Sequence, residues 1–365
     1  MLRPAEFVAP QADRPTPMNC VVIPAYRAAG SILDVIARVG PEVELIVVVD
    51  DCCPEGTGVT VSHRCNDARV VVLVHEVNQG VGGAFMTGMR YAARRGADII
   101  IKVDADGQMD PAQIPALIHP ITTGDADYVK GNRFFFLTNA ASMPSTRKIG
   151  NLALSFMAKL STGYWNIMDP TNGFFAIHAR VADLVAEQDI AKRFFFETDL
   201  LFQLGLLRAR VIEYPMQAFY GDEISNLKIS KVFGPFLAGH LKNTARRILY
   251  RYFLRDFSVG SLQLFVGALL FNFGLAFGAY HWAEGVATNE LVPTGTIMIA
   301  AITLLIGFQL LLAFLSYDIG TTPREVLHPF LERGRKSPEF PFASKPAAID
   351  DAASDDKLRR MRKIS

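Results

Sequence analysis

Two carboxylates at the end of an apolar segment are the residues of this chain best suited to chemistry. Asp104 and Asp106 close the apolar run at residues 99–103, which has the composition of a buried strand. Ligands of open α/β folds bind at the carboxyl edge of the sheet, and an Asp-x-Asp pair there offers the hard oxygen ligands that Mg²⁺ or Mn²⁺ prefers when it bridges a diphosphate. The alternative is a pair of solvated loop aspartates. Asp110, next to Pro111, has the pattern of a helix N-cap.

Side chains that could contact a nucleoside follow two earlier apolar runs. Tyr26 comes after the first run, and Asp50 and Asp51 end the second. Because parallel strands end at one edge of a sheet, we expect Tyr26 and one of the two aspartates to face the same edge as Asp104. An aromatic ring and a carboxylate can stack on a base and accept hydrogen bonds from the base or its ribose. A purely structural role is the alternative for either aspartate.

A glycine-rich stretch at residues 78–88 opens a predicted helix with small side chains. Small residues permit a close backbone approach, either to a phosphate or to the sheet against which the helix packs. The spacing differs from the Gly-x-Gly-x-x-Gly of dinucleotide-binding folds and from the P-loop, which ends in Gly-Lys-Ser/Thr. Helix packing is therefore the favoured interpretation.

Apolar, β-branched runs alternate with segments of helical period along most of the chain. Such alternation predicts βαβ units and a mainly parallel sheet. We therefore expect one α/β domain over residues 19–232, after a Pro-rich and flexible N-terminal tail at residues 1–18. The predicted strands include residues 20–23, 45–49, 70–74, 99–101, 128–129, 174–177 and 211–212.

Two segments near the C-terminus are long and apolar enough to cross a membrane. Residues 258–281 and 293–317 contain no Lys, Arg, Asp or Glu, and each exceeds the roughly 20 residues needed to span a hydrocarbon core of about 30 Å. The link between them lacks Lys and Arg, whereas arginines precede the first segment and follow the second. The positive-inside rule then places both termini and the α/β domain on the cytoplasmic side of the inner (plasma) membrane, with residues 318–365 as a cytoplasmic tail.

The segment that leads into the first apolar span, residues 233–257, alternates apolar and aromatic side chains with Lys242 and four arginines. This pattern is typical of a basic amphipathic helix that lies in the headgroup plane, and a surface helix packed on the domain is the alternative. Within the first span, Gly274 and Gly278 could form a helix-contact face in a homo-oligomer.

The composition argues against other kinds of site. The net charge is only +1 over 365 residues, and no basic face interleaved with aromatics occurs in the α/β segment, so a nucleic-acid partner is not expected. The four cysteines lack paired zinc spacing, and the seven histidines are scattered. We interpret the cysteines as reduced thiols of a cytosolic domain.

In combination, these motifs resemble the family 2 glycosyltransferases, and in particular their polyprenyl-phosphate glycosyltransferase branch. The resemblance covers roughly residues 19–317, and it implies an α/β fold: a GT-A-like, mainly parallel sheet domain followed by a basic amphipathic interface helix and a two-helix transmembrane hairpin. The motifs that carry it lie at residues 23–26, 49–51, 78–84, 104–111, 131–133, 169–174, 196–200 and 220–229.

The resemblance also implies roles for individual residues. The predicted metal ligands, for Mg²⁺ or Mn²⁺, are Asp104, Asp106 and Gln108. The predicted contacts with the nucleotide sugar are Pro24, Tyr26, Asp51, Asp104, Asp106 and Gln108. The predicted catalytic residues are Asp104, Asp106, Arg133 and Asp169, and Glu197 is expected to shape the pocket with Asp169. The predicted ligands of the acceptor phosphate are Arg133, Arg147, Lys148 and Lys228, of which the last three could equally be solvated or headgroup-facing charges.

The implied activity is the transfer of a hexose from a nucleotide-diphosphate sugar to a polyprenyl phosphate such as undecaprenyl phosphate, with inversion at the anomeric carbon. UDP-glucose is the favoured donor and GDP-mannose the second. One alternative is a processive polysaccharide synthase, which would need further spans and a Gln-x-x-Arg-Trp element that neither Trp165 nor Trp282 completes. The other is a catalytically idle membrane scaffold that binds a nucleotide sugar.

Three departures from the family pattern concern donor recognition. Arg27 follows the first-strand tyrosine, where family members usually carry an acidic residue close by. The loop after Gly80 lacks the usual lysine, and Cys52 and Cys53 follow the two aspartates in place of Gly-Ser. These changes affect the base contact more than the predicted catalytic residues.

Overall fold

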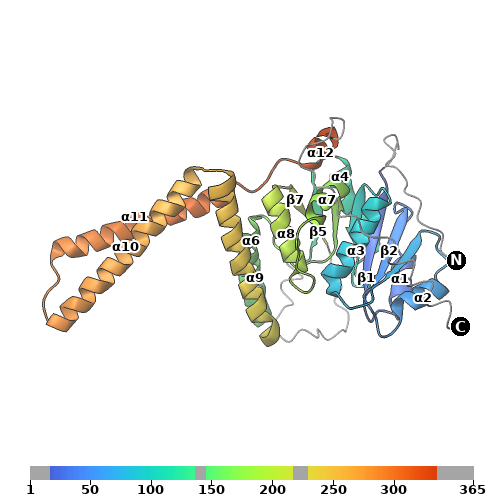
Figure 1. The fold of residues 1–365 in the computed structure, drawn as a ribbon, viewed down its shortest axis with the longest axis horizontal. Helices are drawn as coiled ribbons and strands as arrows, with labels where there is room; N and C mark the ends of the chain where they lie inside the picture. Colours follow the sequence, from blue (N-terminus) through green and yellow to red (C-terminus); the bar gives the residue numbers. More distant parts are fainter. Residues whose placement is uncertain (1–16, 136–144, 217–228, 335–365) are drawn as a thin grey trace, which may run out of the picture. The chain divides into compact units, whose positions relative to one another are not determined.

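The computed structural model, drawn in Figure 1, describes residues 17–135, 145–216 and 229–334. Its α/β part is built on a seven-stranded sheet with the strand order β3-β2-β1-β4-β6-β5-β7. The apolar runs of the sequence form these strands because the sheet is covered on both faces, which favours continuous apolar segments. The strands are β1 (Asn19–Ala25), β2 (Leu45–Asp50), β3 (Val70–Val74), β4 (Ile99–Lys102), β5 (Tyr128–Asn132), β6 (Phe175–His178) and β7 (Val211–Pro215).

One strand of the sheet, β6, is reversed. It pairs antiparallel with β4 and with β5, whereas every other pair is parallel. Lys102 of β4 and Lys130 of β5 both lie opposite Phe175 of β6. The reversal brings the segment before β6, residues 169–174, to the edge at which β4 and β5 end. The predicted, mainly parallel α/β fold is thus confirmed, with this one exception in strand direction.

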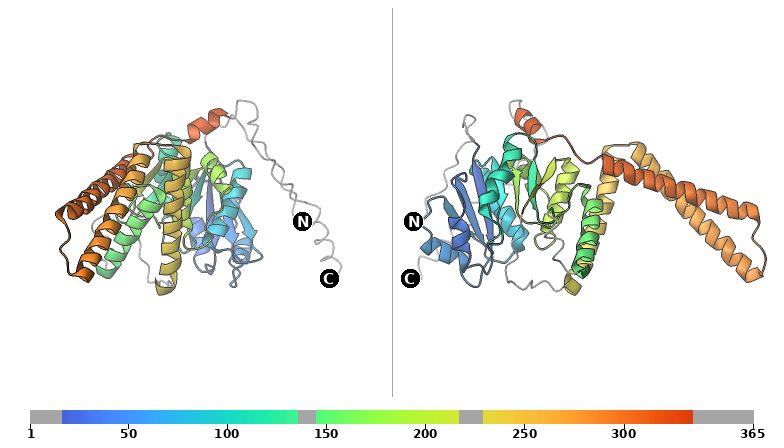
Figure 2. Two further views of the ribbon diagram at one scale, coloured as in Figure 1. Left: turned by 60° about the vertical axis from the view of Figure 1, so that its left-hand side comes forward. Right: turned by 180° about the vertical axis from the view of Figure 1, so that it is seen from behind.

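Helices cover both faces of the sheet (Figures 1 and 2). Successive side chains of a strand point to opposite faces, so Val21 and Ile23 of β1 join the core that includes α1 and α4. Val22 instead lies under α3, where a Cβ on Gly88 would overlap its side chain. The glycine-rich stretch therefore serves helix packing. The helices of this part are α1 (Ile32–Ala37), α2 (Thr57–Arg64), α3 (Gly80–Arg94), η1 (Pro111–Gln113), α4 (Ile114–Thr122), α6 (Ser145–Thr162), α7 (Ala179–Ala186) and α8 (Phe196–Leu207).

In the described part of the chain after β7, five further helical segments follow the sheet. Helix α9 (Ile229–Leu249) packs against α6 and α8 and continues into a π-helical segment, η2 (Tyr250–Arg255). Helices α10 (Val259–Thr288) and α11 (Thr294–Gly320) pack on each other as a hairpin (Figure 1), and both are long and apolar enough to cross a membrane. They contain most of the two apolar segments predicted to span. The last described helix is α12 (His328–Gly334).

The small residues of α10 serve the contact inside the hairpin. A Cβ on Gly274 would lie 2.7 Å from the Leu304 nitrogen and 2.8 Å from Thr303 Oγ1 of α11. A Cβ on Gly278 would lie 3.2 Å from that of Ala300. Close backbone approach at small residues is the usual way in which apolar helices pack in a membrane. The predicted helix-contact face is thus used within the chain.

A buried carboxylate near the end of α11 ties the hairpin to the helices that precede it. Asp318 accepts hydrogen bonds from Arg247 Nη1 at 2.7 Å and Nη2 at 2.9 Å, from the Tyr252 hydroxyl at 2.6 Å and from Trp165 Nε1 at 2.8 Å. Both Asp318 and Arg247 are almost fully buried. A buried charge is tolerated only when it is paired and hydrogen-bonded. We call these four residues the Asp318 clamp.

Beyond α11 the chain returns to the sheet domain at Asp127. This fully buried carboxylate accepts hydrogen bonds from the backbone N–H groups of Leu327 and His328, each at 2.8 Å, and lies 2.9 Å from His328 Nδ1. The His328 ring stacks on His178 at the end of β6, with ring centroids 4.1 Å apart. Burial, followed by the proximity of His328, lowers the pKa of His178 to about 3. The start of the predicted C-terminal tail is therefore attached to the domain.

Candidate active site at the carboxyl edge of the sheet

The predicted metal ligands lie together in one turn after β4. Asp104 is partly buried, whereas Asp106 and Gln108 are exposed. Asp106 Oδ1 accepts a hydrogen bond from the Gln108 backbone N–H at 2.9 Å. Between them, Gly107 has a φ of +80°, a left-handed conformation that glycine adopts without strain. The turn thus carries two carboxylates at the edge of the sheet where β4 ends.

This turn suits a hard divalent cation that shares its ligands with a substrate. Mg²⁺ is commonly held by one or two carboxylates, with substrate phosphates and water completing its shell. Within residues 17–135, 145–216 and 229–334, no three His, Cys, Asp or Glu side chains are arranged to hold a metal by themselves. Asp104 and Asp106 therefore fit a cation that arrives with a diphosphate better than an ion enclosed by the protein.

A buried lysine pairs with the first carboxylate of this turn. Lys102 Nζ lies 2.5 Å from Asp104 Oδ1 and 3.6 Å from Glu197 Oε1 of α8, and the Lys102 side chain is fully buried. Burial alone would lower the pKa of Lys102, but the two carboxylates outweigh it and raise that pKa. Burial raises the pKa of Glu197. The ammonium group therefore stays charged and holds Asp104 in place.

The turn before β6 lies against the same pair. A Cβ on Gly173 would be 2.6 Å from Lys102 Nζ and 2.9 Å from Asp104 Oδ2. Neither distance is possible for a real side chain without movement of the ion pair. Glycine at this position therefore lets the segment at residues 169–174 reach the Asp104 turn.

Arg133, a predicted ligand of the acceptor phosphate, is held by Asp169. The guanidinium donates from Nε to Asp169 Oδ2 at 2.8 Å and from Nη2 to Oδ1 at 2.9 Å. Asp169 is fully buried, and about one third of the Arg133 side chain is exposed. This bidentate arrangement fixes the plane of the guanidinium. Two predicted catalytic residues are therefore brought together, with Asp169 behind Arg133.

A second buried lysine, Lys130, contacts the segment that carries Asp169. Lys130 Nζ donates to the Pro170 carbonyl at 2.8 Å, and Glu213 Oε1 accepts from the Asp169 backbone N–H at 2.8 Å. Burial lowers the pKa of Lys130 to about 8 and raises that of Glu213. The segment that carries Asp169 is thus held by side chains of β5 and β7.

The predicted nucleoside contacts differ in their exposure. Tyr26 is 46% exposed at the end of β1, whereas Pro24 is buried within that strand. Asp51 is buried and accepts hydrogen bonds from the backbone N–H groups of Gln79 at 2.8 Å and Gly80 at 2.7 Å. A carboxylate at a helix N-terminus satisfies free amides there and interacts favourably with the helix dipole. Asp51 therefore holds the start of α3.

The three further predicted phosphate ligands are Arg147, Lys148 and Lys228. Arg147 and Lys148 lie in the first turn of α6. Lys228 lies outside the described residues.

Sequence reasoning assigned no role to the two buried lysines or to Glu213. The signal for both lysines was present, because each interrupts an apolar strand with a cation, and a buried lysine needs acidic partners. Their acidic partners could not be predicted from the sequence, because Glu197, for example, is far from Lys102 along the chain.

A family model and curated relatives match the part of the chain that forms this site. The model described as "Glycosyl transferase family 2" matches residues 20–185. The UDP-N-acetylglucosamine–dolichyl-phosphate N-acetylglucosaminyltransferase of Methanococcus voltae is 31% identical over 216 residues, which is 55% of this chain and 86% of that protein. The undecaprenyl-phosphate mannosyltransferase of Micrococcus luteus is 33% identical over 216 residues, covering 57% of this chain and 86% of that protein.

Similar folds occur among solved structures as well. One is glucosyl-3-phosphoglycerate synthase from Mycobacterium tuberculosis, solved with Mn²⁺, UDP and glucosyl-3-phosphoglycerate, at a TM-score of 0.47 and 17% identity over 63% of this chain and 80% of that one. The family is established by the two sequence relatives, because the match covers 86% of each of them. The chain belongs to glycosyl transferase family 2, in the branch of the polyprenyl-phosphate glycosyltransferases.

Proposed function

We propose that the protein is a membrane-anchored, metal-dependent enzyme that transfers a hexose from a nucleotide-diphosphate sugar to a polyprenyl phosphate such as undecaprenyl phosphate. The observation that supports this proposal most is the Asp104–Asp106 turn, which lies beside the Gly173 segment at the edge that also carries Arg133 and Asp169. A site for a diphosphate and a cation for a second phosphate are thus at one edge of one sheet.

The leaving group in this reaction is a nucleoside diphosphate, which gains negative charge as the bond to the sugar breaks. Asp104 and Asp106, with Gln108, would hold the Mg²⁺ or Mn²⁺ ion, which when bound offsets that charge. Lys102 keeps Asp104 oriented before substrates bind. Because the pair is already formed, little reorganisation is needed at the moment of reaction.

The nucleophile is an oxygen of the lipid phosphate. A phosphate monoester has a second pKa near ~6 and is mostly ionised at neutral pH, so the acceptor needs a cation to position it more than a strong base. Arg133, held in its plane by Asp169, can orient such a phosphate. In-line attack then inverts the anomeric carbon and gives a β-linked product from an α-linked donor.

The identity of the donor sugar is the most specific part of this proposal. The sequence placed UDP-glucose first and GDP-mannose second. The names of these relatives refer to mannose and to N-acetylglucosamine, which supports testing GDP-mannose and UDP-N-acetylglucosamine beside UDP-glucose. Exposed Tyr26 is the predicted base contact that any of these donors would meet.

The hairpin is proposed to anchor the enzyme in the inner (plasma) membrane, with both termini and the catalytic edge on the cytoplasmic side. A polyprenyl chain stays in the bilayer, so an enzyme that acts on its phosphate must work at the interface. Two helices long and apolar enough to cross the membrane, and the basic segment before them, support this arrangement.

The test is transfer of labelled sugar from a panel of nucleotide sugars into organic-extractable undecaprenyl phosphate, with and without Mg²⁺ or Mn²⁺. Asp106→Asn should lower transfer by ~100-fold or more, since it removes a fixed group that acts on charge in the transition state. Asp110→Asn is the matched control, because Asp110 caps η1 by accepting from the Ala112 N–H at 3.2 Å and asparagine caps equally well. No lipid label from any donor, with metal and acceptor present, would contradict the proposal and favour the scaffold.

A further inference from the structure

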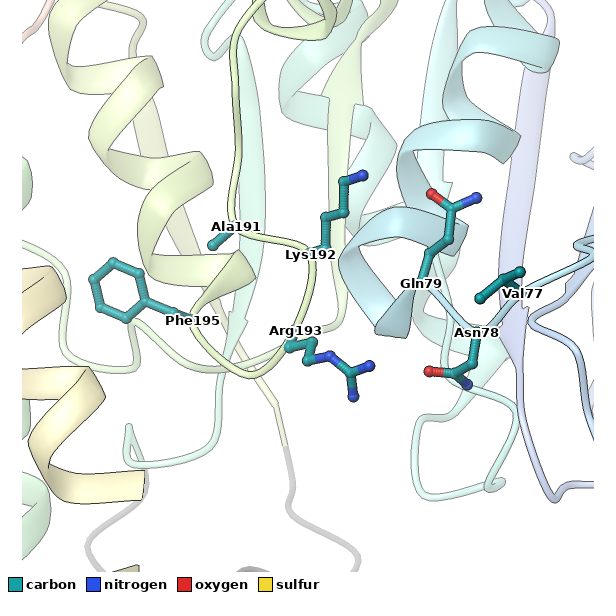
Figure 3. Close-up of a pocket in the computed structure, with 7 residues that line it drawn as sticks. All are labelled: Val77, Asn78, Gln79, Ala191, Lys192, Arg193 and Phe195. Carbon is teal, nitrogen blue, oxygen red and sulfur yellow. The ribbon is translucent and has the colours of Figure 1, made fainter. Parts of the chain in front are cut away.

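A pocket of about 580 Å³ lies beside the proposed catalytic edge and has no role in the mechanism above (Figure 3). One side is formed by the residues that lead into α3, including Asn78 and Gln79. The other is formed by the loop before α8, including Lys192, Arg193 and Phe195. In Figure 3, Arg193 extends from this loop toward Asn78.

The pocket adjoins the site at two points. On one side, the Gln79 backbone N–H is bound by Asp51 at the end of β2. On the other, Phe195 comes two residues before Glu197, which faces Lys102. The Lys192 carbonyl accepts hydrogen bonds from the N–H groups of Gly82 at 2.9 Å and Gly83 at 3.2 Å, and so joins the two sides. The pocket is therefore a fixed part of the carboxyl edge.

The charge of the pocket points to an anion. Lys192 and Arg193 are exposed cations, and among the described residues no acidic side chain lines the pocket. The first free N–H groups of α3 are already used by Asp51 and by the Lys192 carbonyl. An anion would therefore be bound by a cationic side chain rather than by the helix terminus. In Figure 3 the two side chains extend from the loop in different directions, and Arg193 is the one directed across the pocket at Asn78. A guanidinium suits a phosphate group because it offers planar, paired donors.

The position of the pocket points to the lipid substrate. The Phe195 ring packs against Phe236 and His240 of α9, with ring centroids 5.4 and 5.1 Å apart. Helix α9 continues through η2 toward the apolar hairpin. Arg133 already uses two of its donor groups for Asp169. Through Phe195, the pocket is thus joined to the helix that leads into the hairpin.

We propose that this pocket binds the phosphate group of a substrate, with Arg193 as its cationic ligand. The inference rests on the proposed function for the source of that phosphate, which is either the polyprenyl phosphate or the diphosphate of the donor. The contacts of Phe195 with α9 favour the lipid.

The experiment measures binding and turnover separately in full-length protein in non-ionic detergent. Titration calorimetry gives the Kd of farnesyl phosphate and, separately, of UDP and GDP, and kinetics give KM for farnesyl phosphate. Arg193→Gln should weaken the binding of farnesyl phosphate by about 10- to 100-fold, the range for a hydrogen bond to a charged group. Lys192→Gln should have a smaller effect, because the Lys192 side chain extends in another direction. Arg193→Lys should recover only part of the loss because it lacks the planar fork. Arg64→Gln, an exposed arginine on α2, is the matched control.

The possible outcomes separate the sources. Weaker binding of farnesyl phosphate with unchanged binding of UDP and GDP assigns the pocket to the acceptor. The reverse result assigns it to the donor diphosphate. Unchanged binding of both, with variants that fold as judged by their melting temperatures, overturns the proposal. A loss seen only in anionic lipid vesicles also overturns it, since the cations would then contact headgroups. If wild type transfers no sugar but the variants still lose phosphate binding, the proposed function fails and the pocket stands.

Discussion

Two ion pairs lie at the centre of the candidate site: Lys102 pairs with Asp104, and Arg133 pairs with Asp169. Each ion pair has a fully buried member, Lys102 in one and Asp169 in the other. Breaking a buried pair by removing one partner is costly, because an uncompensated charge is left behind. Such pairs therefore contribute more to a fixed geometry than to net stability, and in the proposed reaction that geometry is what a metal and a phosphate would meet.

Gly173 offers a way to move the Asp104 pair without changing its charge. We expect Gly173→Ala to reduce sugar transfer by about 100-fold, the effect of misplacing a reacting group by about 1 Å, and to raise the metal concentration needed for half-maximal activity. The added Cβ would lie 2.6 Å from Lys102 Nζ and 2.9 Å from Asp104 Oδ2. Gly150→Ala, where nothing lies within 4 Å of an added Cβ, should be silent. Unaltered activity and metal requirement in Gly173→Ala would contradict the placement of Gly173 against the pair.

Two connections attach the hairpin of α10 and α11 to the sheet domain. The Asp318 clamp joins the end of α11 to α9 and η2. The segment after α11 then binds Asp127 through Leu327 and His328. Because both connections use buried, hydrogen-bonded carboxylates, the hairpin is joined to the domain by more than the covalent chain.

Asp318→Asn should destabilise the protein, since it leaves the Arg247 guanidinium buried without a counter-charge. The expected loss is about 3–5 kcal/mol, the usual cost of removing one partner of a buried pair. It would be measured as a lower unfolding midpoint in detergent. Asp256→Asn, an exposed aspartate just after η2, is the control. Equal midpoints for the two variants would show that the clamp contributes little.

The attachment at Asp127 should weaken in acid because of His178. Its pKa is about 3 in the folded protein against 6.5 as the ordinary value, so between these pH values the unfolded chain binds more protons. The contribution of His178 is therefore fully present above about pH 6.5 and is lost as the pH falls toward about 3, by at most ~1.4 kcal/mol per pH unit.

His178→Asn isolates this effect. His178 caps α7 by accepting from the Arg180 N–H at 3.2 Å, and asparagine keeps such a cap while it cannot titrate. Unfolding midpoints measured at several pH values should fall less steeply in acid for the variant than for wild type. Parallel curves would mean that other groups cause the acid sensitivity.

In the proposed function, the whole molecule joins a donor site, an acceptor cation and a membrane anchor in one chain. The sheet domain handles the soluble nucleotide sugar, and the hairpin keeps the protein where the lipid is. This division explains why the two parts differ so strongly in composition.

The predicted topology can be tested with cysteine labelling in intact cells. Leu291, in the link between α10 and α11, is 99% exposed, and Leu291→Cys should react with a membrane-impermeant maleimide from outside. The native Cys52, which is exposed on the sheet domain, should react only after the cells are permeabilised. Peptide mapping assigns the two labels. Labelling of Cys52 in intact cells would reverse the proposed orientation.

Much of the fold and part of the site were predictable from sequence. Continuous apolar runs identified the strands and the two long helices, since both depend on local composition. The Asp104 turn was predicted because its two carboxylates, Asp104 and Asp106, are only two positions apart in the sequence. The contact of Asp51 with the start of α3 was not predicted. An aspartate at the end of a strand can face a ligand or cap a helix, and the two cases look alike in sequence.

The sequence by itself determined the element types, the family and the residues grouped around Asp104, because each of these depends on residues close together in the chain. Only the tertiary structure decided the direction of β6, the pairing of Lys102 with Glu197 and the clamp between Arg247 and Asp318. An apolar run predicts a buried strand whichever way it points. A buried charge requires a partner, but which partner it receives depends on how distant segments pack.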